Sequence, residues 1–124
     1  MISIIDDDAS VRAATDNLLR SLGYTVCTFV SAEEFLRSAD FNDTSCVIAD
    51  VQMPGMSGVD LQARLLAQGH RVSFIFITAF PEEAVRTRAL NAGAICFLTK
   101  PFDRLTLVGC LNTALARHGG GTRE

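Results

Sequence analysis

Polar side chains stand at the ends of four short apolar segments of this sequence, and their types could bind a cation and carry phosphoryl chemistry. The residues are Asp6, Asp7, Asp50, Thr78 and Lys100. Carboxylates gathered at one place repel one another unless one takes up a proton or a cation binds between them. Mg²⁺ suits such a place, because it prefers oxygen ligands and keeps positions open for water or a phosphoryl oxygen.

Asp50 is the best candidate for a nucleophile in this set. It stands alone at the end of its apolar segment, and a carboxylate that attacks phosphorus forms an acyl phosphate. The Lys100 ammonium is a compact charge that could pair with this carboxylate before transfer and with a phosphate oxygen afterwards. The Thr78 hydroxyl could donate a hydrogen bond to the bound phosphoryl group. Each residue type is common in loops, turns or strands, so the argument rests on their combination.

Short apolar runs alternate with amphipathic segments along the chain, which predicts five strands and five helices. The strands are predicted over 2–5, 25–29, 46–49, 73–77 and 94–98, where the runs are short, apolar and rich in β-branched or aromatic residues. The helices are predicted over 10–22, from Ser31, from Ser57 to Gly69, from Pro81 to Gly93 and over 103–116. Ser31 and Ser57 are expected to be N-caps, and residues 40–44 a polar loop.

This alternation is typical of an α/β fold with a doubly wound parallel sheet. The strands are continuous apolar runs, so helices are expected to cover both faces of the sheet. Ligands bind such sheets beyond the carboxyl ends of the strands, which is where the five polar residues fall. One domain is predicted over residues 1–118, followed by a glycine-rich flexible tail over 119–124.

The composition excludes several classes of protein. Of 124 residues, 48% are hydrophobic and 20% charged, as in an ordinary globular domain. No apolar run is long enough to cross a membrane, and a formal net charge of −3 provides no basic surface for nucleic acid. We therefore expect a cytoplasmic protein that contacts neither membrane nor nucleic acid. Only one of its eleven basic residues, Lys100, is a lysine, a weak hint that an ammonium is needed there.

The four cysteines show no C-x-x-C spacing. Cys27, Cys46 and Cys96 lie in apolar, strand-like runs, and Cys110 lies in the last predicted helix. We interpret all four as thiols that pack as small hydrophobic residues, with a metal site or a disulfide as the alternatives.

Four motifs stand out at the predicted strand ends. They are Ile4-Ile5-Asp6-Asp7-Asp8, Ile48-Ala49-Asp50-Val51-Gln52-Met53-Pro54-Gly55-Met56-Ser57-Gly58, Ile77-Thr78-Ala79, and Ala92-Gly93-Ala94 through Lys100-Pro101-Phe102. In this order and with these gaps, they resemble the receiver domains of two-component response regulators. The resemblance covers about residues 2–117, and the segment Ser31–Leu36 together with the Lys-Pro-Phe ending is most similar to FixJ/NarL-like receivers. It implies a flavodoxin-like fold with five parallel strands in the order 2-1-3-4-5.

The resemblance implies a role for each residue of the pocket. Asp50 is then the phosphoacceptor. Asp7 and Asp50 bind Mg²⁺ directly, the backbone carbonyl of Gln52 is a third protein ligand, and Asp6 acts through water. Lys100 and Thr78 bind the phosphoryl oxygens.

The resemblance also implies a switch and its partners. Phe97 matches an aromatic residue that turns inward when Thr78 moves toward the phosphate, and the peptide bond between Lys100 and Pro101 is expected to be cis. The phosphoryl donor is a histidine kinase, and the face formed by the fourth helix, fifth strand and fifth helix then changes its contacts with a downstream protein or output domain. That face also suits a dimer that forms on phosphorylation. The chain would be a signalling domain that catalyses only its own phosphorylation and dephosphorylation.

Three other functions compete with this one. A phosphorylation-independent interaction module would fit a degenerate pocket, but all five polar residues are present. An aspartyl-nucleophile phosphatase carries a second acid two residues after the nucleophile, and that position is Gln52 here. A dinucleotide-binding domain is disfavoured because no G-x-G-x-x-G follows the first predicted strand.

Phe80 follows Thr78 by two positions and should flank the phosphoryl group. From its size and position, we hypothesise that it screens this group from attacking water and slows self-dephosphorylation.

Overall fold

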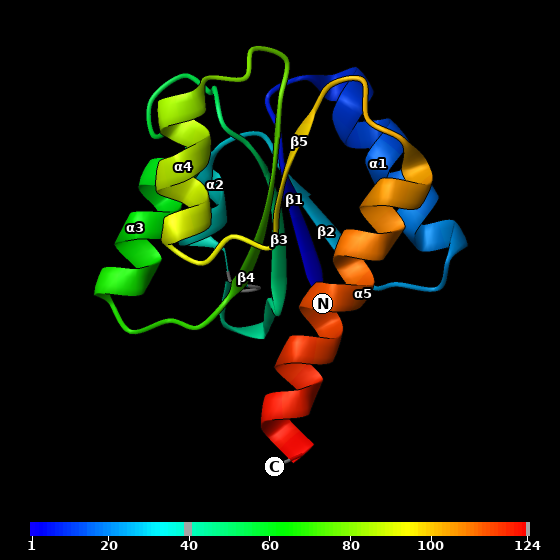
Figure 1. Ribbon diagram of the computed structural model, residues 1–124. Helices are drawn as coiled ribbons and strands as arrows, with labels where there is room; N and C mark the ends of the chain where they lie inside the picture. Colours follow the sequence, from blue (N-terminus) through cyan, green and yellow to red (C-terminus); the bar gives the residue numbers. More distant parts are fainter. Residues whose placement is uncertain (39–40, 124) are drawn as a thin grey trace.

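The computed structural model describes residues 1–38 and 41–123, which form a five-stranded sheet between two layers of helices (Figure 1). The strand order is β2-β1-β3-β4-β5, and every neighbouring pair is parallel. Helices α1 and α5 cover one face of the sheet, while α2, α3 and α4 cover the other. The predicted fold class and strand order are therefore confirmed.

All five predicted strands and all five predicted helices are present, with ends that differ by a few residues. The strands are β1 (Ile2–Ile5), β2 (Val26–Phe29), β3 (Cys46–Asp50), β4 (Ser73–Thr78) and β5 (Cys96–Thr99). The helices are α1 (Ala9–Ser21), α2 (Ala32–Arg37), α3 (Gly58–Ala67), α4 (Glu83–Asn91) and α5 (Arg104–Arg123). A short 3₁₀ helix, η1 (Phe41–Asp43), lies within the predicted polar loop, whose first residue, Asp40, is outside the described residues.

Helix α5 is longer than predicted. It continues to Arg123, whereas the sequence pattern places its end at residue 116, before the glycine run. Glycine has little intrinsic preference for helix, so a prediction from the sequence pattern ends the helix before the glycine run. That residues 119–124 form a flexible tail stays a prediction.

Side-chain caps fix where three of the helices begin. At α2 the Ser31 hydroxyl accepts the Glu34 N–H at 3.0 Å, as in the predicted capping box. The Glu34 carboxylate accepts the N–H of Val30, one residue before the cap, at 3.1 Å. The Ser57 hydroxyl caps α3 through the Asp60 N–H at 3.1 Å. The Asp8 carboxylate caps α1 in the same way.

The sheet separates two apolar cores, which explains why its strands are apolar throughout. Strand residues such as Phe76 and Val47 face α2, α3 and α4, whereas Ile48 and Ile75 face α1 and α5. Every residue of β1 and of β3 is buried. The buried centre of the sheet therefore fixes the positions of the residues at the carboxyl ends of these two strands.

One interpretation of the cysteines was wrong. Cys96 and Cys110 are joined by a disulfide with their Cα atoms 6.2 Å apart, so they are not both free packing thiols. The bond connects β5 with α5 across 14 positions of the sequence. Their spacing carries no disulfide signal, because the two sulfurs meet only when α5 packs on the sheet. Cys46 is fully buried, as expected of a small hydrophobic residue.

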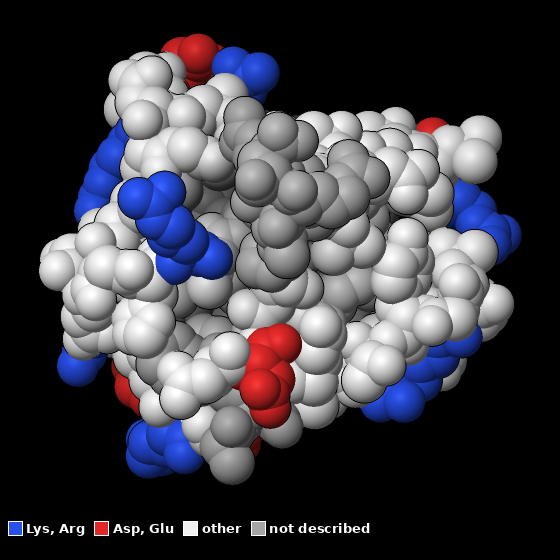
Figure 2. Space-filling view, turned by 90° about the horizontal axis from the view of Figure 1, so that it is seen from below, with Lys and Arg blue, Asp and Glu red and all other residues white. Residues whose placement is uncertain are grey.

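The end of the molecule at the amino ends of the strands has a mixed surface. Figure 2, which views it from below, shows basic side chains at several places around the edge and acidic side chains at others. Within the described residues, no helix combines the length and the apolar character needed to cross a membrane. The polar residues that the sequence indicates lie at the opposite end, where the strands finish.

The attachment of α5 to the sheet can be tested at one side chain. Leu107 is fully buried, so we expect Leu107→Ala to lower the free energy of unfolding by about 2–5 kcal/mol. The matched control is Leu105→Ala on the same helix, where the side chain is 76% exposed and the change should stay within about 0.5 kcal/mol. Urea unfolding followed by circular dichroism measures both, and equal effects would contradict this packing.

Candidate functional site

The carboxyl ends of β1, β3, β4 and β5 bring the polar residues to one edge of the sheet, at the top of Figure 1. Strand β3 lies between β1 and β4, with Ala49 opposite Ile5 and Asp50 opposite Ile77. Asp50 is the last residue of β3, and Asp6 directly follows β1. Neighbouring parallel strands that end level with each other must place these carboxylates together.

Three carboxylates form a cluster at this edge. Asp6, Asp7 and Asp50 each place one carboxylate oxygen within 4.8 Å of the others. Asp6 is fully buried, Asp50 is 6% exposed, and Asp7 lies on the solvent side. The predicted convergence of the three acids is confirmed.

The Lys100 ammonium lies between two of these acids. Its Nζ is 3.0 Å from Asp50 Oδ2, which accepts a hydrogen bond, and 3.3 Å from Asp6 Oδ2. The side chain is only 16% exposed, so little water screens these attractions. Because one ammonium faces three carboxylates, the site keeps an excess of negative charge.

Backbone N–H groups hold the other oxygen of each buried acid. Asp50 Oδ1 accepts the Gln52 N–H at 3.0 Å, and Asp6 Oδ1 accepts the Asp8 N–H at 2.9 Å. Among the described residues, Asp6 Oδ2 has no hydrogen-bond partner, and its contact with Lys100 is an ion pair alone. A buried oxygen with this unused capacity, beside two more carboxylates, fits a hard divalent cation.

The charges in the site shift two pKa values. Burial raises the pKa of Asp6, and the neighbouring Asp50 charge adds to this, while the Asp8 N–H and Lys100 oppose it. Burial lowers the pKa of Lys100, but the hydrogen bond that its ammonium donates to Asp50 and the charges of Asp6 and Asp50 outweigh this and leave the pKa above its ordinary value. Lys100 therefore remains an ammonium at neutral pH.

Thr78 is the last residue of β4, and Phe97 lies within β5. The Thr78 side chain is fully buried, and its Oγ1 accepts the Phe80 N–H at 3.1 Å, which leaves the hydroxyl hydrogen for another acceptor. The Thr78 carbonyl accepts the Lys100 N–H at 2.8 Å, so β4 directly positions the start of the Lys100 segment. Phe97 is half-buried on the α4 side of the sheet, with its ring 6.3 Å from that of Phe76.

The peptide bond between Lys100 and Pro101 is cis, as the resemblance implied. Phe80, at the start of the connection from β4 to α4, is 70% exposed.

The loop after Asp50 depends on residues that the sequence did not single out. The Glu33 carboxylate of α2 accepts the Met56 N–H at 3.0 Å, which lowers the pKa of Glu33. At Gly58, an added Cβ would lie 2.5 Å from the Asp50 carbonyl oxygen, so only glycine allows this close approach. Arg12 of α1 donates to the Asp6 carbonyl at 2.7 Å. The contact between Glu33 and Met56 joins residues 23 positions apart, so no local pattern indicates it.

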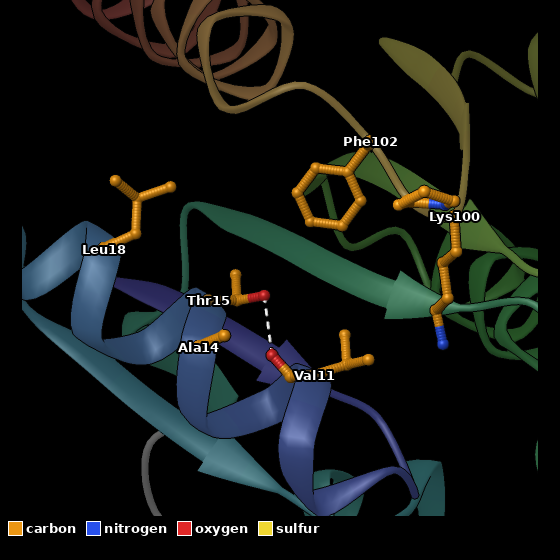
Figure 3. A pocket seen from close by; sticks show the side chains of 7 residues that line it. Val11, Ala14, Thr15, Leu18, Lys100 and Phe102 are labelled. Atoms are coloured by element: carbon orange, nitrogen blue, oxygen red, sulfur yellow. Dashed lines mark hydrogen bonds between the residues drawn. The ribbon is translucent and has the colours of Figure 1, made fainter.

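An apolar pocket of about 430 Å³ adjoins the acidic cluster (Figure 3). Val11, Ala14, Thr15 and Leu18 of α1 form one wall, and the segment from Lys100 to Phe102 forms the other. In Figure 3 the Phe102 ring faces α1, and the Lys100 side chain extends past the end of β3. Lys100 thus borders the pocket and contacts the acids.

Comparison with known proteins identifies relatives along nearly the whole chain. The family model of the response regulator receiver domain matches residues 2–112. Response regulator protein TmoT of Ectopseudomonas mendocina is 42% identical over 115 residues, which are 93% of this chain and 52% of TmoT. The chain spans about half the length of the curated relatives it matches.

Solved structures agree with this. The response regulator StyR superposes with a TM-score of 0.89 at 38% identity, over 98% of this chain and 62% of StyR. FixJ-N superposes with a TM-score of 0.81 at 31% identity, over 91% of this chain and 90% of the other.

The buried Asp6 carboxylate should make the metal-free protein less stable as the pH rises. The folded-state pKa of Asp6 is raised above its ordinary value of 3.8, so the folded chain holds this proton more tightly than the unfolded chain. In the window between these two values, the free energy of unfolding falls as pH increases, because unfolding releases the proton. Asp6→Asn should remove this loss and raise the free energy of unfolding at pH 7 by about 1–2 kcal/mol.

Urea unfolding in EDTA across pH 3.5–7.5 measures the effect. The matched control is Asp43→Asn, which changes an exposed acid away from the cluster and should leave the pH profile as in the wild type. A less stable Asp6→Asn protein at pH 7 would contradict the electrostatic account.

Proposed function

The chain belongs to the response regulator receiver family, and from this premise we propose that it works as a phosphorylation switch, accepting a phosphoryl group on Asp50 in a Mg²⁺-dependent reaction. It is the receiver domain of a two-component response regulator. The observation that carries the proposal is the cluster of Asp6, Asp7 and Asp50, with the Lys100 ammonium 3.0 Å from Asp50. A nucleophilic carboxylate, a cation site and a counter-charge for phosphate are thereby side by side.

Receiver domains bind Mg²⁺ at an acidic pocket, and this pocket has a suitable set of donors. We propose Asp7 and Asp50 as direct ligands, with the backbone carbonyl of Gln52, and Asp6 as a ligand through water. The support is that the carboxylate oxygens lie within 4.8 Å of one another and that the buried Asp6 Oδ2 has no hydrogen-bond partner among the described residues. When bound, Mg²⁺ would supply neutralisation of the charge on the transferred group.

The contacts of Asp50 suit an attack by Oδ2. Because the Gln52 N–H holds Oδ1, the carboxylate keeps one orientation, with Oδ2 directed at Lys100. In the proposed reaction, Oδ2 forms a bond to phosphorus while the bond from phosphorus to a phosphohistidine nitrogen breaks, and the electron pair of that bond returns to the imidazole. Lys100 then changes its partner from the carboxylate to a phosphoryl oxygen.

Thr78 and Phe97 are the proposed relay to the surface formed by α4, β5 and α5. The Thr78 hydroxyl hydrogen has an acceptor once a phosphoryl oxygen is present, and donation to it would draw Thr78 toward Asp50. Phe97 is half-buried beside Phe76, so part of its ring faces solvent and part contacts the core. A rotation of the side chain would therefore change how much of the ring is buried. We propose that Phe97 turns inward as Thr78 moves and that the α4–β5–α5 face then changes its partner.

The phosphoryl donor in this proposal is a histidine kinase that docks at the apolar pocket between α1 and the Lys100–Phe102 segment (Figure 3). Lys100 both lines this pocket and contacts Asp50, so a donor seated there has its phosphohistidine next to the nucleophile. A downstream protein or an output domain receives the signal. A cytoplasmic location, and a dimer formed on phosphorylation, belong to the same proposal.

Acetyl phosphate tests the proposed chemistry without a kinase. With Mg²⁺, intact-mass measurement should show one added phosphate on the wild type and none on Asp50→Ala, because the attacking oxygen is removed. EDTA should abolish the addition. Asp60→Ala is the matched control: it removes an exposed acid of α3 that pairs with Arg88 at 3.6 Å, and it should be phosphorylated like the wild type.

Two outcomes would contradict the proposal. A phosphate that still adds to Asp50→Ala would place the acceptor elsewhere. Absence of phosphorylation in the wild type, with partner binding unchanged in Asp50→Asn, would favour a phosphorylation-independent interaction module.

Phe80 provides a test of how long the phosphorylated state persists. The ring is 70% exposed and two residues from Thr78, and we propose that it folds over the phosphoryl group and excludes attacking water. Phe80→Ala should then shorten the lifetime of phosphorylated Asp50 severalfold, measured by mass spectrometry after removal of acetyl phosphate. Leu66→Ala, which truncates another exposed apolar side chain, is the control. An unchanged or longer lifetime would refute the screening role.

A further inference from the structure

Cys96 and Cys110 connect two elements that carry the Lys100 segment between them. We propose that this cysteine pair is a reversible thiol–disulfide site, oxidised by low-molecular-weight disulfides of the glutathione class and reduced by dithiols, and that oxidation fastens α5 to β5. The proposal does not rest on phosphorylation of Asp50.

The fold itself brings the two sulfurs together. The Cα atoms lie 6.2 Å apart, within the range that a disulfide spans without backbone movement. Cys96 begins β5 and pairs with Ile75 of β4, and Cys110 lies within α5 among the apolar residues of that face. Buried Leu107 and Leu111 hold α5 on the sheet independently of the bond. After reduction, the two thiols therefore stay close enough to be oxidised again.

Burial differs between the two cysteines and sets the order of the chemistry. Cys96 is half-buried, whereas Cys110 is 6% exposed. The Cys96 thiolate attacks one sulfur of the small disulfide, whose S–S bond breaks and releases one thiolate. The Cys110 thiolate then attacks Cys96 Sγ in the mixed disulfide and releases the second. Two protein thiols are oxidised, one external disulfide is reduced to two thiols, and the two protein protons pass to the released thiolates.

The other buried cysteine shows why this pair is distinctive. Cys46 is fully buried in β3, and burial raises its pKa to about 12. It therefore stays a protonated, unreactive thiol at neutral pH. The half-buried Cys27 has its Sγ 3.4 Å from Met1 Sδ at the far edge of the sheet, in β2. Among the four cysteines, all of which are described, only Cys96 and Cys110 combine a second cysteine within bonding distance with an approach from solvent, through Cys96.

The position of the bond gives oxidation a consequence for the site. Phe97, Lys100 and Phe102 all lie between the bonded cysteines. In the oxidised chain, both ends of this segment are fixed by a covalent bond, while in the reduced chain only side-chain packing holds α5 to β5. A disulfide in a reducing compartment is usually transient and has a sensing role. Because the bond also closes a loop, it restricts the unfolded chain and thereby stabilises the folded one.

Thiol trapping in glutathione buffers of increasing oxidised fraction tests the proposal. After quenching with N-ethylmaleimide in denaturant, the wild type should pass from four alkylated cysteines to two, in a single two-electron transition, with Cys96 and Cys110 joined in the peptide map. Cys27→Ser, the matched control, should keep this transition, and Cys96→Ala and Cys110→Ala should each lose it. Asp50→Ala should also keep it, which separates this proposal from the phosphorylation proposal.

Thermal unfolding provides the second readout. The oxidised wild type should unfold at a temperature higher than the reduced protein by roughly 5–10 °C, and the Cys96→Ala/Cys110→Ala double variant should show no dependence on redox state. Amide hydrogen exchange in the first turns of α5 should be slower after oxidation. A bond that dithiothreitol does not reduce in the folded protein, thiols that never pair, or equal melting temperatures would overturn the proposal.

Discussion

The structure depends on one electrostatic constraint, the concentration of three carboxylates around a single ammonium at the end of a buried sheet. Asp6 is fully buried and Asp50 almost so, so their repulsion is not relieved by water. Lys100 contacts both and remains charged because they raise its pKa. One ammonium leaves negative charge uncompensated, and carboxylate oxygens with such an excess of charge suit a small, hard cation.

The surrounding backbone is organised to keep these charges in place. The N–H groups of Gln52 and Asp8 each hold one carboxylate oxygen, and the other oxygen of each acid is left for cations. Behind them, Gly58 lets α3 begin against the Asp50 carbonyl, and Glu33 holds the intervening loop through Met56. Rigid strands place the acids, and short-range contacts from neighbouring helices fix the loops between them.

The sequence was sufficient for the fold and for the members of the cluster, because both follow from local patterns. Apolar runs that end in Asp6, Asp50 and Thr78 indicate buried parallel strands and polar carboxyl ends. The sequence was insufficient for tertiary contacts between segments that are distant along the chain. The Cys96–Cys110 bond and the contact of Glu33 with Met56 depend on how α5 and α2 pack. Helix α5 also continues through the glycine run, although helix propensities predict that it ends there.

Under the proposed function, burial of Asp6 explains why a cation is needed at all. When Lys100 turns to a phosphoryl oxygen, its 3.3 Å ion pair with Asp6 weakens, and Asp6 Oδ2 has no hydrogen bond among the described residues to replace it. A buried carboxylate without a counter-charge is strongly disfavoured, so either a proton or a cation must compensate. Asp6, Asp7 and Asp50 would hold such a cation, whose charge would keep Asp6 ionised once Lys100 has changed its partner. In this proposal, a magnesium requirement would arise as much from the neighbour of the nucleophile as from the nucleophile itself.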